Sequence, residues 1–280
     1  HLGDAILKER AYGRPAGTNL LWAPDGLRFS WMDEYPREDR VAAMRHAIEN
    51  MIATGTVAFA DFRENGAAGV TELREACAGT PISATICARF SPPPAQTPQE
   101  LSENTAGLSA DRIRELEACL EVADGFSPVW ANELTDPALR DVANRVRAAG
   151  KRLATHAIET PNYRQLSLDR TGRSDVNRVI DIIQPDYVVH MTDATKEELN
   201  QVSAAGLPLV FCPRGQAALG NGFSPIADAL DAGLTVSLGT DNAMLNSPDI
   251  LKEMDFLARV APAVGRDPAA VQPKALLTAA

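Results

Sequence analysis

Residues 151–159 read KRLATHAIE, from Lys151 to Glu159, and this stretch decides the fold. A turn signal at Gly150 precedes a short apolar run, the run ends in His156, and Glu159 follows three residues later. A run bounded in this way is typical of a buried strand whose end carries polar groups. A neutral imidazole is the commonest metal ligand, and a carboxyl group about one turn away can carry protons. Taken alone, however, such a His is more often a hydrogen-bonded structural residue.

The same arrangement recurs twice further along the chain. Residues 186–190 read DYVVH and end in His190, and residues 234–241 read LTVSLGTD and end in Asp241. The carboxyl ends of neighbouring parallel strands lie on one rim of a sheet. The sequence therefore predicts that His156, His190 and Asp241 form a set of metal ligands on that rim.

Short apolar runs alternate with helical patterns along the whole chain. Strands are expected at 56–62, 81–88, 126–130, 153–156, 186–190, 207–212 and 234–241. Helices are expected at 38–54, 69–78, 109–123, 136–149 with Asp136 as its N-cap, 175–183, 195–205, 224–232, 247–259 and 273–280.

His1-Leu2-Gly3-Asp4 is interpreted as the tip of a further strand whose body precedes residue 1, which makes eight strands. Eight strand–helix units predict an α/β fold of the TIM type, a (β/α)8 barrel, with its site at the carboxyl ends of the strands. A Rossmann-like sheet is the alternative. No GxGxxG pattern follows an early strand, which disfavours it.

Length and composition limit the functions that the chain can have. A chain of 280 residues suits one large domain, and the formal net charge of −10 disfavours nucleic acid as a partner. No apolar run approaches the ~20 residues that span a bilayer, so no membrane association is expected. Four scattered cysteines without CxxC spacing indicate free thiols in a reducing compartment, and we expect a cytoplasmic protein. The sequence is compatible with a homo-oligomer.

The ends of the chain are unusual. The sequence has no initial Met, begins with His1, and ends in an expected helix. We interpret residues 1–280 as a single barrel domain truncated at both ends.

A long irregular stretch, 11–36, contains several Gly and Pro residues together with Trp22 and Trp31. Loops of this length in compact domains are usually functional, and disordered segments are poor in aromatic residues. We expect this stretch to cover the mouth of the barrel and Trp22 or Trp31 to contact the substrate.

With these residues in view, the chain resembles the metal-dependent amidohydrolase superfamily. The likeness is to its aminohydrolase branch, which includes cytosine, guanine and S-adenosylhomocysteine deaminases and the triazine chlorohydrolases. His1 matches the second His of the family's HxH motif, and the first would lie before residue 1. His156 and Glu159 match HxxE, His190 matches the sixth-strand His, and Asp241 matches the eighth-strand Asp.

Three further details bear on the resemblance. Cys212-Pro213-Arg214 is similar to the family's seventh-strand segment, but Gly215-Gln216 stands where Ser-Asn is common. The β-sandwich that flanks the family's barrel has no counterpart in this sequence. A branch with two metals uses a carboxylated lysine on the fourth strand, and 126–133 contains no lysine. The resemblance therefore implies a mononuclear site.

The resemblance implies one divalent metal ion held by His1, His156 and Asp241, with His190 as a further ligand or as a group that orients water. His and Asp ligands suit zinc and iron, and zinc is preferred. Glu159, His190 and Asp241 are the expected catalytic residues, with Glu159 as the proton carrier. A structural metal site, or an inactive site retained for packing, is the alternative interpretation.

Three arginines follow expected strand ends: Arg63, Arg89 and Arg214. Each alone is more often an ion-pair residue, but three at one mouth suggest recognition of a carboxylate or phosphate on a small-molecule substrate. Glu64 and Glu133 could instead neutralise them. Asn132 is a further expected substrate contact, and Asn242 and Asn246 are plausible polar contacts.

Three functions compete. The first is an aminohydrolase that deaminates a heterocyclic amine with a metal-activated water. The second is a hydrolase of cyclic amides or imidazolones, similar to imidazolonepropionase. The third is a catalytically inactive barrel used for binding. Release of ammonia distinguishes the first from the second, and metal content distinguishes both from the third.

Overall fold

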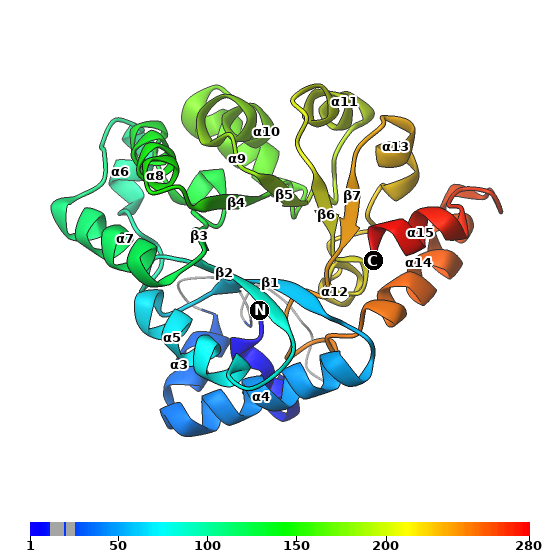
Figure 1. Cartoon of the computed structure of the whole chain (residues 1–280). Helices are drawn as coiled ribbons and strands as arrows, with labels where there is room; N and C mark the ends of the chain where they lie inside the picture. The colour runs from blue at the N-terminus through cyan, green and yellow to red at the C-terminus, as the bar shows by residue number, and fades with distance from the viewer. Residues whose placement is uncertain (12–19, 21–25) are drawn as a thin grey trace.

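The structure is a computed structural model that describes residues 1–11, 20 and 26–280. Its strands are β1 (Ala58–Arg63), β2 (Ser83–Ala88), β3 (Gly125–Phe126), β4 (Arg152–Ala157), β5 (Tyr187–His190), β6 (Leu209–Phe211) and β7 (Val236–Leu238). They form one sheet in the order of the sequence, and each strand pairs in parallel with the next. The sheet curls into a partial barrel with helices around its outside (Figure 1).

The helices before β4 are η1 (Gly3–Leu7), α1 (Lys8–Ala11), α3 (Leu27–Asp33), α4 (Arg37–Ala53), α5 (Gly66–Cys77), α6 (Pro98–Glu103), α7 (Ala110–Val122), η2 (Ala131–Glu133) and α8 (Asp136–Ala148). Those after it are α9 (Asn162–Thr171), α10 (Asp175–Arg178), η3 (Val179–Ile183), α11 (Lys196–Ala204), α12 (Pro213–Leu219), α13 (Ile226–Asp231), α14 (Ile250–Gly265) and α15 (Pro273–Ala279). No helix in the described part is long and apolar enough to cross a membrane.

The seven strands expected within the chain are all present, and the TIM-type (β/α) barrel architecture is confirmed. The eighth strand in the expected count lay before residue 1. Residues His1 to Asp4, expected as its tip, lead instead into the 3-10 helix η1. The Asp4 carboxylate accepts hydrogen bonds from the Asn242 side chain and the Met244 amide, which ties this turn to the segment after β7.

Other differences have local causes. The third strand is two residues long rather than five, because the backbone leaves the sheet before Val129, where φ is 63°. Thr135, not Asp136, caps α8, since its hydroxyl accepts from the Ala138 amide while Asp136 pairs with Arg178. The helices α9 and α12 were not expected from the sequence. The helix expected at 195–205 is present as α11, and Thr195 and Glu198 form a capping box at its start.

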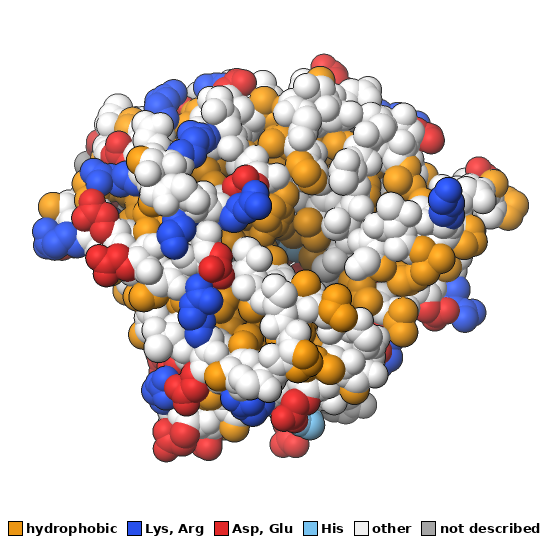
Figure 2. Space-filling model, viewed as in Figure 1, with side chains coloured by type: hydrophobic (Ala, Val, Ile, Leu, Met, Phe, Trp, Pro, Cys, Tyr) orange, Lys and Arg blue, Asp and Glu red, His pale blue; other side chains and the backbone are white. Residues whose placement is uncertain are grey.

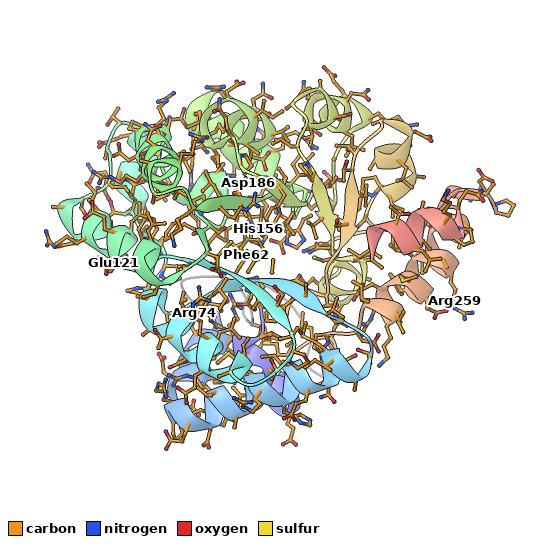
Figure 3. All side chains as sticks on the ribbon, viewed as in Figure 1. Phe62, Arg74, Glu121, His156, Asp186 and Arg259 are labelled. Carbon is orange, nitrogen blue, oxygen red and sulfur yellow. The ribbon has the colours of Figure 1, made fainter. Side chains whose placement is uncertain are left out.

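Two apolar layers hold the barrel together. Between the sheet and the helices lies the main core, which includes Ile86, Leu116 and Leu153. Inside the barrel is a smaller cluster of buried side chains: Phe62, Cys87, Ala154, Val189 and Cys212. Phe62 and His156 lie at the middle of the molecule, whereas Arg74, Glu121 and Arg259 lie on outer helices (Figure 3). Phe62 of the interior cluster packs against the His156 ring, with the ring centroids 4.6 Å apart, so this cluster adjoins the expected site.

The surface carries both signs of charge. On the face in Figure 2, acidic and basic side chains are scattered over the outer helices, and hydrophobic side chains gather toward the middle. Although the net charge is −10, this face shows no single large patch of acidic side chains.

Candidate metal centre and active site

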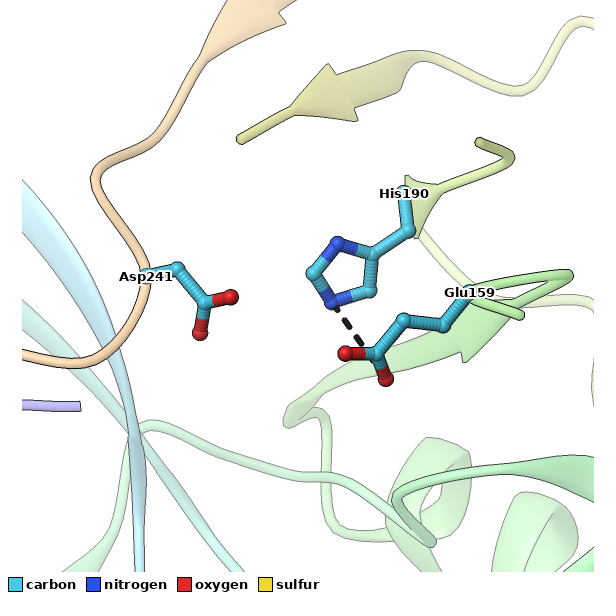
Figure 4. A group of neighbouring side chains, drawn as sticks. All are labelled: Glu159, His190 and Asp241. Carbon is cyan, nitrogen blue, oxygen red and sulfur yellow. Dashed lines mark ion pairs between the residues drawn. The ribbon is translucent and has the colours of Figure 1, made fainter. Parts of the chain in front are cut away.

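A cavity lies at the carboxyl ends of the strands. Five of its lining residues are the expected metal and catalytic residues, and we call them the histidine site: His1, His156, Glu159, His190 and Asp241. The strands β4, β5 and β7 bring together residues separated by up to 85 positions in the sequence, His156 to Asp241. Glu159 and His190 lie next to each other and Asp241 faces them across a gap (Figure 4). Ligand atoms of these three lie within 4.8 Å of one another.

The histidine rings are oriented by backbone carbonyls. His156 Nδ1 donates to the Val129 carbonyl at 3.0 Å, and His1 Nδ1 lies 3.0 Å from the Phe62 carbonyl. A proton on Nδ1 leaves Nε2 as the lone-pair nitrogen, which is the usual arrangement of a metal-binding His. Burial, followed by the neighbouring His190, holds the pKa of His156 well below its usual value. His156 is therefore a neutral imidazole, the form that binds a cation.

Asp241 completes a donor set for a cation. Its Oδ2 is buried and has no hydrogen-bond partner among the described atoms, while Oδ1 lies 4.0 Å from His1 Nε2. An orphaned buried carboxylate oxygen is costly unless something pairs with it. Two imidazole nitrogens and this carboxylate are ligand types that suit a divalent transition metal. The residues present therefore fit a metal ion.

Glu159 lies beside this donor set and is held by two neighbours. The Trp130 indole N–H donates to its Oε2 at 3.1 Å, and the Gln216 amide approaches its Oε1 at 3.5 Å. Burial raises the pKa of Glu159, and the Asp241 carboxylate raises it further. A carboxyl group with a raised pKa exchanges a proton more readily near neutral pH, as a general acid–base group requires.

The backbone around the cavity is strained. Val129, Ile158, His190 and Asp241 have φ values of 63°, 39°, 78° and 58°. Left-handed backbone is unfavourable for residues with a Cβ, above all for the β-branched Val and Ile, at roughly 1–3 kcal/mol each. Such strain persists where the surrounding structure enforces it, and it clusters at functional sites. Here it aims the Val129 carbonyl at His156 and turns Glu159 over the cavity.

A second polar group, the arginine cluster, adjoins the histidine site. It consists of Arg28, Arg63, Glu64 and Arg89, all at least nine-tenths buried. Glu64 lies 2.5 Å from Arg63, 3.1 Å from Arg28 and 3.5 Å from Arg89. Burial alone would raise the pKa of Glu64, but the three guanidinium groups outweigh it and lower the pKa to about 2.

The predicted substrate contacts lie in different places. Arg89 lines the cavity. Arg63 turns toward Glu64 and Asp61, and Arg214 pairs with Glu253 on α14. The Asn132 amide donates to the Tyr163 carbonyl and accepts from Arg178. These three are not among the described residues that line the cavity.

The expected covering stretch is only partly described. Its α3 contributes Arg28 to the cavity, and Trp31 packs in an apolar cluster with Met32 and Met244. Trp22 lies outside the described residues.

A family model described as the amidohydrolase family matches residues 1–280. The chain belongs to the amidohydrolase family. This amidohydrolase chain is 35% identical over 260 residues to a protein of Methanothermobacter thermautotrophicus that is named, provisionally, an aminohydrolase; the match covers 93% of the chain and 65% of that protein. It is 27% identical to a 5-methylthioadenosine/S-adenosylhomocysteine deaminase of Haloquadratum walsbyi, over 91% of the chain and 59% of the deaminase. The chain thus spans about two thirds or less of these relatives.

Solved structures share the fold. The zinc complex of atrazine chlorohydrolase from Arthrobacter aurescens TC1 matches with a TM-score of 0.80 at 18% identity, over 99% of this chain and 66% of that one. An adenosine deaminase from Xanthomonas campestris with bound zinc matches with a TM-score of 0.78 at 20% identity, over 100% and 63% of the two chains.

Three residues at this amidohydrolase site were missed by the sequence analysis: Arg28, Trp130 and Gln216. Arg28 lies in the irregular stretch, and Trp130 lies beyond the end of a strand. The sequence contained one signal for Gln216, because this residue stands at a position where Asn is common in the family.

Proposed function

We propose that the protein is a metal-dependent aminohydrolase that removes an amino group from a heterocyclic amine. One observation carries this proposal: a buried Glu159 with a raised pKa lies beside a neutral histidine and an unpaired aspartate oxygen. A purely structural metal site would need no proton-exchanging acid beside it. The relatives named as deaminases agree in reaction class.

In this proposal His156, His1 and Asp241 hold one divalent ion. Zinc is the first choice because two structures with the same fold contain it, and iron suits the same ligands. An ion held there would lower the pKa of a coordinated water to about 7. His190 either orients the water or is a further ligand.

The protein's own groups move the protons. Asp241 accepts the first proton from the attacking water through its carboxylate. Glu159 gives its proton to a ring nitrogen of the substrate, takes up the hydroxyl proton of the resulting adduct and passes that proton to the leaving amine. The proton held by Asp241 then restores Glu159. Trp130 fixes the Glu159 carboxyl group in place, so the proton is delivered at one position of the cavity.

Arg89 is the proposed contact to a polar or anionic group of the substrate. It lines the cavity, and its distance of 3.5 Å from Glu64 is longer than the 2.5 Å of Arg63. Arg89 can therefore turn to a substrate oxygen at less expense than Arg63. We also propose a cytoplasmic location, because the four cysteines are unpaired.

A screen of the zinc-loaded, iron-loaded and metal-free protein against heterocyclic amines tests the function. Metal-dependent release of ammonia is the expected result. Ring opening of a cyclic amide or imidazolone without ammonia would contradict deamination and identify the alternative hydrolase. A protein that binds no metal and turns over no substrate would be a binding barrel.

A further inference from the structure

Gln216 lies on α12, directly after β6, and its side chain is completely buried against the histidine site. Its Nε2 lies 2.9 Å from His190 Nδ1 and 3.5 Å from Glu159 Oε1. Its Oε1 accepts from the Asn221 amide at 3.0 Å. One amide therefore contacts both a histidine and the acid that we assign to proton transfer.

These partners fix which way the amide points. The Asn221 amide supplies a donor to Oε1, and the Glu159 carboxylate supplies an acceptor for Nε2. The reverse orientation would place the amide oxygen against the carboxylate oxygen. Amide orientation is assigned from such networks. With Nε2 as the donor, His190 Nδ1 is the acceptor, so the ring proton of a neutral His190 lies on Nε2.

We infer that Gln216 is a positioning residue that holds His190 as the tautomer with its proton on Nε2, so that His190 donates a hydrogen bond into the cavity, and that it holds Glu159 beside this histidine. His190 Nε2 lies 3.8 Å from Glu159 Oε2, which is beyond hydrogen-bond distance. Its N–H thus faces the space between Glu159 and Asp241. The inference rests on the proposed function.

The contrast among the histidines supports this inference. His156 and His1 have Nδ1 beside a backbone carbonyl, which only accepts, and so they present a lone pair at Nε2. His190 has Nδ1 beside an amide N–H, which only donates, and so it presents a proton. The carbonyl-oriented pair suits a cation, and the amide-oriented histidine suits an oxygen or nitrogen acceptor.

Gly215 supplies a second, independent reason to assign this segment to the site. A Cβ on Gly215 would lie 2.9 Å from both Cβ and Oδ2 of Asp241, a distance that real Cβ atoms do not tolerate. The pair Gly215-Gln216 departs from the family's Ser-Asn at both positions, and both residues contact the site. The absence of a Cβ at Gly215 leaves room for the Asp241 side chain, and Gln216 orients His190 and Glu159.

The tautomer can be measured directly. In protein labelled with ¹⁵N in its four histidines, the ¹⁵N shifts and the couplings to the ring carbon protons show which nitrogen is protonated. We expect His190 to carry its proton on Nε2 with and without zinc. Gln216→Glu offers an acceptor to Nδ1 and should move the proton there, and Gln216→Met, of similar shape, should give a mixture. Gln201→Glu on the outer helix α11 is the matched control and should change nothing.

Activity and metal content complete the test. Loss of one aimed donor lowers kcat by about 10²–10³-fold in other enzymes, and we expect Gln216→Met to lose at least about 10-fold in kcat with KM and bound zinc little changed. A proton on Nδ1 of His190 in the unaltered protein would overturn the inference even if Gln216→Glu fails to fold. So would loss of zinc in Gln216→Met with no change of tautomer. If no amine is deaminated, the tautomer measurement still decides the role of Gln216 while the proposed function fails.

Discussion

The histidine site and the arginine cluster lie side by side at the ends of the strands, yet they are built in opposite ways. In the arginine cluster one carboxylate, Glu64, is shared among three guanidinium groups, and its pKa falls to about 2. Glu64 Oε1 lacks a hydrogen bond but lies 3.1 Å from both Arg28 and His1 Nδ1. In the histidine site Asp241 Oδ2 has neither a hydrogen bond nor an ion pair among the described atoms, and burial raises the pKa of Glu159. Both are buried and polar, so burial alone does not mark a functional site. The difference is whether the charges compensate one another without a ligand.

The largest expected effect is on metal binding. His156→Ala should lower zinc affinity by more than about 100-fold and abolish turnover, because even outer partners of a ligand contribute about 10–100-fold. Elemental analysis and competition with a chelator measure this, and one ion per chain is expected in the unaltered protein. His46→Ala is the control, since the His46 side chain is 78% exposed. Equal zinc content in both variants would mean that His156 is not a metal ligand. The proposed contrast between a ligand-binding histidine site and a self-compensated arginine cluster would then fail.

The next effect concerns Glu159. Glu159→Gln keeps the shape but removes the transferable proton, so kcat should fall by about 10²–10⁴-fold while bound zinc is unchanged. A structural role for Glu159 as the ion-pair partner of Arg164 is disfavoured, because Arg164 pairs with Glu198. Measurement of kcat, bound zinc and melting temperature on one preparation decides between the roles. Near-normal kcat with a lowered melting temperature would falsify the catalytic role.

The third effect is on stability rather than on metal binding or turnover, and it belongs to the arginine cluster. Glu64→Gln removes the shared carboxylate, and breaking a buried ion pair typically lowers the free energy of unfolding by about 3–5 kcal/mol near neutral pH. Because the folded-state pKa of Glu64 is about 2, its contribution is present above the usual value of 4.5 and is lost as pH falls from 4.5 toward 2. The difference in unfolding free energy between the Glu64→Gln variant and the unaltered protein should therefore shrink by on the order of 3 kcal/mol as the pH falls.

Denaturant unfolding from pH 7 to pH 2.5 measures that gap. Glu75→Gln is the matched control, because Glu75 lies 2.5 Å from Arg37, the same distance as in the buried pair, but is half exposed. It should change the unfolding free energy little at any pH. If the Glu64→Gln protein were as stable as the control, the Glu64 carboxylate would not be what stabilises the buried charges of the three arginines.

The positions of the chemical groups along the barrel could be predicted from sequence. An apolar run that ends in His or Asp places that residue at a strand end, and parallel pairing brings such ends to one rim. This is why His156, Glu159, His190 and Asp241 were expected together and line one cavity. Short side chains at a strand end have little freedom to point elsewhere.

The directions of the long side chains could not be predicted in this way. Arg63 and Arg214 also follow strand ends, but each has several rotatable bonds and turns toward a carboxylate on its own side of the barrel. Arg28 reaches the cavity from the stretch expected to be irregular, and Trp130 reaches it from beyond the end of β3, where a longer strand was expected. Their places depend on contacts between residues far apart in the chain.

The sequence by itself therefore determined the barrel and the identity of the donor groups, because strand periodicity sets which residues reach the rim. Only the tertiary structure decided how those donors are tuned. The Val129 carbonyl and the Gln216 amide give His156 and His190 opposite partners at Nδ1, although both histidines end similar runs. The partners in these two hydrogen bonds are 27 and 26 residues apart in the sequence. A local sequence pattern therefore cannot predict which partner each histidine has.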